Sequence, residues 1–196
     1  RRWNRMEEFE IKFLEINVPE LEKKLLEIGA KKVAEYDYHR ILLDYPDLRL
    51  NQKNSWLRLR TDDTETTLTY KERIGVKSND GSVADDGMKE TEIIVDSYDK
   101  TYEIFKSIGF IVKVEERNKR IRYQKGDVVF DIDFWPGIPT YIEIESISME
   151  QAQSAAKELG FDPKDGLVCS AKQVYKRYGI DKDEYSYISF DKMIKK

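Results

Sequence analysis

Apolar and charged side chains alternate along much of this chain, which is the pattern of strands with two unlike faces. Residues two apart in a strand share a face, so Glu8, Glu10 and Lys12 lie together and apolar neighbours occupy the other side. Eight segments are predicted to be extended, with approximate bounds 7–17, 31–45, 55–62, 65–73, 88–96, 111–124, 127–135 and 140–147.

The charged face recurs in six later segments, which carry Arg58 and Arg60, then Lys71, then Glu90 and Glu92, then Arg120 and Arg122, then Asp131 and Asp133, and finally Glu143 and Glu145. For any single strand, the simplest interpretation is a solvated face of an antiparallel sheet. The recurrence along the chain, with acids dominating some strands and bases others, favours a charged face that is enclosed instead.

Four further segments predict amphipathic helices that end at a glycine, at about 19–28, 99–108, 149–159 and 171–178. Such helices can cover the apolar face while the twist of the sheet curls it around the charged face. We therefore predict an α+β fold, in which eight antiparallel strands close into a barrel with the helices packed outside. The domain is expected to span residues 6–180, with 1–5 as a tag or extension and 181–196 as a C-terminal tail.

Composition narrows the function classes. Charged residues make up 37% of the 196 residues, but 38 acids nearly balance 34 bases, which argues against a nucleic-acid partner. No apolar stretch approaches membrane-spanning length, so no membrane partner is expected. The single cysteine, Cys169, permits no internal disulfide and fits a cytoplasmic protein. A homodimer is left open.

Enclosed charges are costly unless each one is paired or binds something. Arginine and lysine suit phosphate oxygens, and clustered carboxylates suit hard cations such as Mg²⁺ or Mn²⁺. An interior that needs both therefore indicates a site for a polyphosphate and a divalent metal.

The ordered motifs of the chain resemble the CYTH domain family, also called the triphosphate tunnel metalloenzymes. The resemblance covers about residues 7–178, and two positions, Met88 and Asn118, depart from the family's usual pattern. The matching motifs are E-x-E-x-K at 8–12, L-R-x-R at 57–60, L-T-x-K at 68–71, E-x-E at 90–92, a basic strand at 119–123, an aspartate strand ending in Trp-Pro at 131–136 and E-I-E at 143–145.

This resemblance implies an eight-stranded tunnel in which bases hold a triphosphate and acids hold Mg²⁺ or Mn²⁺. The bases expected to bind and act on the substrate are Lys12, Arg58, Arg60, Lys71 and Arg120. Arg122 and Lys172 are expected to add substrate contacts. The expected metal ligands are Glu8, Glu10, Glu90, Glu92, Asp133, Glu143 and Glu145.

The implied activity is metal-dependent hydrolysis of a small-molecule triphosphate, whether inorganic, nucleoside or thiamine triphosphate. A class IV adenylate cyclase, which makes cyclic AMP and pyrophosphate from ATP, is the first alternative. A non-catalytic nucleotide or polyphosphate sensor is the second, and an interaction domain with a solvated charged face is the third.

Overall fold

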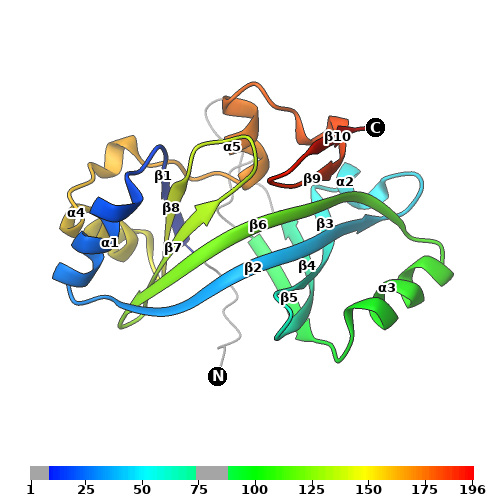
Figure 1. The fold of residues 1–196 in the computed structure, drawn as a ribbon, viewed down its shortest axis with the longest axis horizontal. Coiled ribbons are helices and arrows are strands. Elements are labelled where there is room, and N and C mark those ends of the chain that lie inside the picture. The colour runs from blue at the N-terminus through cyan, green and yellow to red at the C-terminus, as the bar shows by residue number, and fades with distance from the viewer. Residues whose placement is uncertain (1–8, 74–87) are drawn as a thin grey trace.

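The computed structural model describes residues 9–73 and 88–196, so the predicted site residue Glu8 lies outside the described residues. The described strands form one ten-stranded sheet, in the order β1-β8-β7-β6-β2-β3-β4-β5, with β9 on β6 and β10 on β9 (Figure 1). The strands are β1 Phe9–Phe13, β2 Lys31–Asp44, β3 Ser55–Thr61, β4 Thr66–Arg73, β5 Met88–Ile94, β6 Ile111–Lys125, β7 Val128–Phe134, β8 Tyr141–Ser146, β9 Tyr185–Ile188 and β10 Met193–Lys195.

The four predicted helices are confirmed, each within one residue of its expected bounds. Side-chain oxygens of Asn17, Ser97, Ser148 and Ser170 accept backbone N–H groups at the four starts, which explains why each helix begins there. The helices and short helical turns are α1 Val18–Glu27, α2 Arg49–Gln52, α3 Tyr98–Ser107, α4 Met149–Glu158, η1 Pro163–Asp165, α5 Ala171–Arg177 and η2 Lys182–Glu184.

The two longest strands, β2 and β6, lie at the centre of the sheet. They pair antiparallel from Lys31 opposite Gln124 to Asp44 opposite Ile111. Figure 1 shows them crossing the molecule side by side, with α1 and α4 over one half of the sheet and α3 beside the other. The remaining strands extend the sheet from these two in opposite directions.

Alternation places the two faces of the sheet as predicted. Ile11, Ile142 and Ile144 lie in a buried core with residues of α1 and α4, while Leu59 lies in a second core beneath α3. Their charged neighbours in sequence line a cavity on the other face. Because the apolar side chains of each strand are buried beneath the helices, the alternating charged side chains lie on the concave face of the sheet.

The prediction of a closed barrel is wrong, because the sheet curls into an open half-barrel. The edge strands β1 and β5 are not paired with each other in the described part of the chain. The outer edge of β1 bonds instead to Leu167, whose N–H and C=O bond the C=O and N–H of Lys12 at 2.9 and 2.8 Å. The chain after α4 therefore occupies the edge that closure would need.

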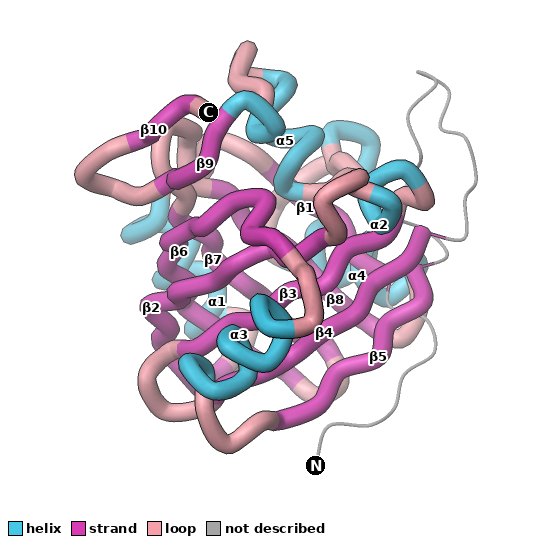
Figure 2. Tube along the Cα trace, turned by 90° about the vertical axis from the view of Figure 1, so that its right-hand side faces the viewer, coloured by secondary structure: helices cyan, strands magenta, loops and turns pink. Residues whose placement is uncertain are grey.

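The C-terminal residues fold onto the sheet. Strand β9 lies parallel to β6, with Tyr187 opposite Glu115 and Ile188 opposite Glu116, and β10 folds back on β9. Figure 2 shows β9 and β10 with α5 over one end of the sheet. None of the helices in residues 9–73 and 88–196 has the length and apolar character needed to cross a membrane.

Candidate active site

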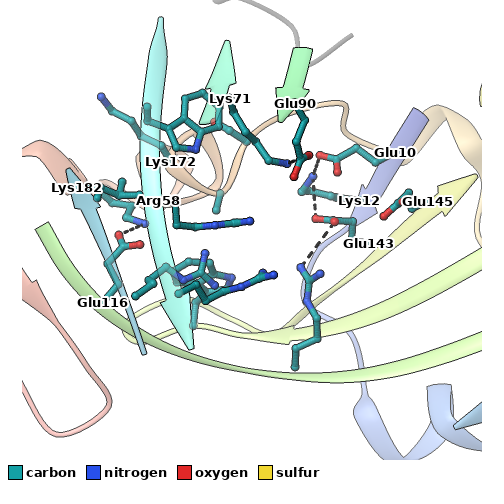
Figure 3. Close-up of a pocket in the computed structure, with 18 of the residues that line it drawn as sticks. Glu10, Lys12, Arg58, Lys71, Glu90, Glu116, Glu143, Glu145, Lys172 and Lys182 are labelled. Carbon is teal, nitrogen blue, oxygen red and sulfur yellow. Dashed lines mark hydrogen bonds and ion pairs between the residues drawn. The ribbon is translucent and has the colours of Figure 1, made fainter. Parts of the chain in front are cut away.

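The concave face of the sheet encloses a cavity of about 570 Å³ whose walls are mostly charged (Figure 3). The structure brings together at this cavity most of the predicted site residues: Glu10, Lys12, Arg58, Arg60, Lys71, Glu90, Arg120, Arg122, Glu143, Glu145 and Lys172. They come from β1, β3, β4, β5, β6, β8 and α5, so the curled sheet is what assembles them.

Lys12 is the most deeply placed base, with 2% of its surface exposed. Its Nζ forms an ion pair with Glu10 and lies 3.1 Å from Oε2 of Glu143. Burial alone would lower the pKa of Lys12, but the charges of Glu10 and Glu143 raise it well above the ordinary value. Lys12 is therefore a permanent cation between two acids.

Arg120 and Arg122 are held by two buried aspartates on the neighbouring strand β7. Asp133 accepts hydrogen bonds from Nε and Nη2 of Arg120 at 2.7 and 2.6 Å, and Asp131 accepts from Nε and Nη2 of Arg122 at the same distances. Burial opposes the charge on Arg120, but Asp131 and Asp133 raise its pKa well above the ordinary value. Both guanidinium groups are thus fixed in orientation before any ligand arrives.

Asp133 does not line the cavity, although it was predicted as a metal ligand. Its side chain is fully buried, and both of its oxygens accept from Arg120. Burial raises the pKa of Asp133 to about 6, against the opposing effect of Arg120. Its place in the structure fits a residue that positions Arg120.

Glu92 has a similar place on the opposite wall. Its Oε2 accepts from Thr69 at 2.7 Å and from Nη2 of Arg58 at 3.4 Å, and lies 3.9 Å from Nη2 of Arg60. It does not line the cavity, whereas its neighbour Glu90 does and pairs with Lys71 at 2.6 Å. Cross-strand register explains the difference, because Glu92 faces Thr69 and Glu90 faces Lys71.

A group of carboxylates at one end of the cavity has the chemistry of a metal site. One oxygen each of Asp131, Glu143 and Glu145 lies within 4.8 Å of the others. Asp131 is already bonded to two arginines, whereas Glu143 and Glu145 line the cavity. Glu10, which also lines the cavity, lies opposite Glu145 in the register of β1 on β8. Oxygen-only donors of this kind fit Mg²⁺ or Mn²⁺.

Glu143 carries its charge although it is only 12% exposed. Burial raises the pKa of a carboxyl group, but Lys12 and Arg120 outweigh it here and lower the pKa of Glu143 below its ordinary value of 4.5. Its Oε1 lies 3.7 Å from Nη2 of Arg120, and its Oε2 lies 3.1 Å from Nζ of Lys12. Glu143 is therefore an anion that lines the cavity between Lys12 and Arg120.

Sequence reasoning missed several residues of the cavity wall. The charged residues of the wall that the sequence pattern does not predict as site residues are Arg40, Lys113, Glu116, Asp127 and Lys182. The register of β2 on β6 would have been needed to find Arg40, which lies between Arg60 of β3 and Glu116 of β6. Lys182 belongs to the segment 181–196, which is predicted to be a C-terminal tail.

The chain matches one protein family and is similar in fold to several solved structures. The family model of the CYTH domain matches residues 6–170. A solved structure of a putative adenylate cyclase from Vibrio parahaemolyticus is 16% identical, with a TM-score of 0.71, and covers 87% of this chain and 98% of its own. A protein from Pyrococcus horikoshii is 21% identical, with a TM-score of 0.69 over 85% of this chain and 98% of its own.

A third solved structure, from Hippeastrum, is described as a putative adenylyl cyclase with a dominant triphosphatase activity. It is 18% identical, with a TM-score of 0.63, and covers 89% of this chain and 96% of its own. A search of curated proteins finds no sequence match to the chain. At these identities the solved structures show the fold alone.

Proposed function

Since the chain belongs to the CYTH domain family, we propose that it binds a triphosphate compound in this cavity and hydrolyses it with a divalent metal ion. The observation that carries the proposal is the meeting of opposite charges in one cavity. Acids of β1, β5 and β8 and bases of β3, β4 and β6 line the same cavity. Such an interior is costly to fold, and a polyphosphate with a metal ion would give charges of both signs further partners.

In this proposal the bases hold the phosphate oxygens. Arg58, Arg60 and Arg120 offer paired N–H groups that match phosphate oxygens, while Lys12 and Lys71 act as point charges. The fixed guanidinium of Arg120 supports a role in stabilising charge that builds up on the phosphate during reaction. Because Asp133 holds it in advance, little reorganisation is needed at the moment of reaction.

The acids Glu10, Glu143 and Glu145 are proposed to hold the metal ion, with Glu90 on the facing strand as a further candidate. Their charge and their oxygen donors support this role. When bound, a divalent ion supplies positive charge at the phosphate oxygens and lowers the pKa of a coordinated water. The chain's own contribution is to orient both groups in the cavity.

Cyclisation of ATP is the second candidate, and one observation favours it. Trp56, Asn51 and Asn54 line the cavity beside the bases, and together they could stack on and hydrogen-bond to an organic group. Two of the similar structures carry names of adenylate cyclases, and one of these two is described by its triphosphatase activity. We favour hydrolysis over cyclisation, because hydrolysis needs only contacts to the phosphates and the metal ion.

A non-catalytic sensor would be a different class of protein. Phosphate binding alone calls for bases, and metal-binding carboxylates at the same cavity add repulsion towards a free polyanion. Glu10, Glu143 and Glu145 therefore support turnover over simple binding. The distinguishing result is product formation that requires added metal.

Phosphorus NMR on the purified chain tests the proposal. Tripolyphosphate, ATP and thiamine triphosphate are offered in turn with Mg²⁺ or Mn²⁺, and with a chelator as control. We expect orthophosphate to appear only with metal, and Arg60→Gln to abolish it while Arg117→Gln, on the outer parity of β6, does not. Cyclic nucleotide with pyrophosphate from ATP would establish the cyclase instead, and no turnover of any substrate would contradict both.

A further inference from the structure

Arg60 has like charges close to it on the concave face of the sheet. It lies directly opposite Arg40 in the register of β2 on β3, and like charges in opposite positions of a sheet repel each other. Glu92 lies 3.9 Å from Nη2 of Arg60 and also accepts hydrogen bonds from Arg58 and Thr69. At 3.9 Å the pair with Glu92 is too long for a hydrogen bond, so it does little to fix the direction of the guanidinium.

Tyr38 of β2 makes a different kind of contact with the same group. Cζ of Arg60 lies over the Tyr38 ring, 4.4 Å from its centre, which is within the range of a cation–π contact. Only 6% of Tyr38 is exposed, and within the described part of the chain it is not among the residues that line the cavity. The ring therefore contacts Arg60 from within the protein, where it can hold the guanidinium without touching a ligand.

The kind of contact matters for binding. An arginine that is paired with a carboxylate spends N–H groups on that pair, as Arg120 does with Asp133. An aromatic ring that stacks on a guanidinium attracts its flat face and leaves the N–H groups at its edge to other partners. Tyr38 can therefore fix the plane of Arg60 at no cost in the donors that match phosphate oxygens.

Tyr36 supports Tyr38 from the same face of β2. The two rings stack with their centres 5.0 Å apart and their planes 10° from parallel. Cζ of Arg122 lies 5.8 Å from the centre of the Tyr36 ring. Strand β2 lies between β6, which carries Arg122, and β3, which carries Arg60. The two rings therefore form an aromatic spacer between two basic strands, and Tyr36 limits the movement of Tyr38.

Tyr38 contacts Arg60 as a neutral ring and not as a negative charge. Burial raises the pKa of Tyr38 above its ordinary value of 10.0, although Arg60 and Arg120 oppose this effect. The phenol is therefore neutral at physiological pH. A phenylalanine at this position would keep the ring face that contacts Arg60, whereas a leucine would remove it.

We propose that Tyr38, backed by Tyr36, is a positioning residue that holds the guanidinium of Arg60 by the face of its ring and keeps the N–H edge of that group directed into the cavity. This inference rests on the proposed function for the ligand that Arg60 binds. It assigns a role in the site to two uncharged residues of β2 that act through an arginine and do not themselves contact the ligand.

NMR of the ligand-free chain labelled with nitrogen-15 tests the contact itself. Protons over the face of an aromatic ring are shielded, so the Nε–H signal of Arg60, assigned by its loss in Arg60→Gln, should lie upfield. Tyr38→Leu should move this signal downfield, and Tyr38→Phe should leave it in place. A signal that moves equally in both variants, or in neither, would show that the ring does not hold Arg60.

Titration calorimetry with inorganic tripolyphosphate, in the absence of metal, measures the effect on binding. Tyr38→Leu should bind this ligand about tenfold more weakly than wild type, because Arg60 is no longer held. Tyr38→Phe should stay within about twofold of wild type. In an Arg60→Gln background, Tyr38→Leu should cause no further loss, since Tyr38 acts through Arg60. The same loss with and without Arg60 would refute the positioning role.

Tyr123→Leu is the control for the loss of a buried ring. Tyr123 is 3% exposed in the core beside α1, where its hydroxyl donates to Glu22 at 2.8 Å. This variant should lower the melting temperature but change the affinity by less than about twofold. An equal loss of affinity in Tyr123→Leu would mean that Tyr38→Leu acts only through stability, and would overturn the inference. Failure of the proposed function looks different: wild type then binds no tripolyphosphate or never turns it over with metal, while the Nε–H signals still decide whether Tyr38 holds Arg60.

Discussion

Asp133 accepts two hydrogen bonds from the guanidinium of Arg120, at 2.7 and 2.6 Å, in a fully buried position directly across β6 and β7. Because Asp133 is behind the cavity wall, its role in the proposed reaction is to position Arg120. Asp133→Asn should lower kcat/KM for the triphosphate about a hundredfold, as expected for a misplaced charge. The free energy of unfolding should fall by about 3 kcal/mol, since a buried pair is broken.

Asp37→Asn is the matched control, because Asp37 pairs with Lys119 at 3.6 Å on the exposed outer face. Its effect on the free energy of unfolding should be below about 1 kcal/mol, and activity should not change. Steady-state kinetics and denaturant unfolding measure the two quantities. Equal effects of the two substitutions would contradict a positioning role for Asp133.

Glu143 makes the stability of the metal-free chain depend on pH. Its pKa is lower in the folded chain than its ordinary value of 4.5, chiefly because Lys12 and Arg120 outweigh the effect of burial. Its charge therefore contributes stability that is present above about pH 4.5 and is lost as the pH falls further. Glu143→Gln removes this contribution, so the gap in melting temperature between wild type and variant should shrink on acidification.

Thermal unfolding of both proteins in chelator, from pH 7 to pH 3, measures the gap. An exposed carboxylate provides the comparison: Glu27→Gln, whose ion pair with Lys23 spans 3.8 Å on the surface, should give a small gap at every pH. A gap for Glu143→Gln that stays constant or widens on acidification would mean that Lys12 and Arg120 do not stabilise the Glu143 carboxylate.

Gly166 is needed where the chain seals the outer edge of β1. A Cβ at this position would lie 2.2 Å from Cδ1 and 2.5 Å from Cγ1 of Ile11, which is buried in the core. Gly166→Ala should therefore destabilise the fold by about 1–3 kcal/mol through overpacking. Leu167, the next residue, is the one that bonds the backbone of Lys12.

A double-mutant cycle isolates this contact. Ile11→Val removes Cδ1 and should cost about 1 kcal/mol alone, but combined with Gly166→Ala it relieves part of the clash. The combined loss in the free energy of unfolding should be smaller than the sum of the two single losses. Strict additivity would show that Ile11 is not what Gly166 accommodates.

Alternation and helix caps made much of this fold predictable. Glu10, Lys12, Arg58 and Glu143 could be assigned to one face because strand side chains alternate and their apolar neighbours needed a core. The open edge of the sheet could not be predicted, because backbone bonds between Lys12 and Leu167 occupy the edge of β1 and leave no signal in side-chain types.

The finer layout of the site depended on register, which sequence pattern does not reveal. Glu90 and Glu92 share a face, yet only Glu90 reaches the cavity, since Glu92 faces Thr69 and bonds to it. Lys182 lies among charged residues in the sequence, in the segment 181–196 that is predicted to be a tail. In the structure Lys182 is buried, and β9, which follows it, pairs with β6. In both cases, the position of the side chain depends on the residue that lies next to it on the neighbouring strand.

In the proposed function, acids and bases of one cavity bind a metal ion and a triphosphate together. The most direct measurement is calorimetric affinity for tripolyphosphate, alone and as its Mg²⁺ complex, in wild type and Glu145→Gln. Wild type should bind the complex more tightly, because the carboxylates attract the metal ion and repel the free anion. In Glu145→Gln the preference should shrink or reverse, with metal-free binding unchanged or stronger. Equal weakening of both forms in the variant, or a wild-type preference for the metal-free anion, would show that these carboxylates do not hold a metal ion beside the triphosphate.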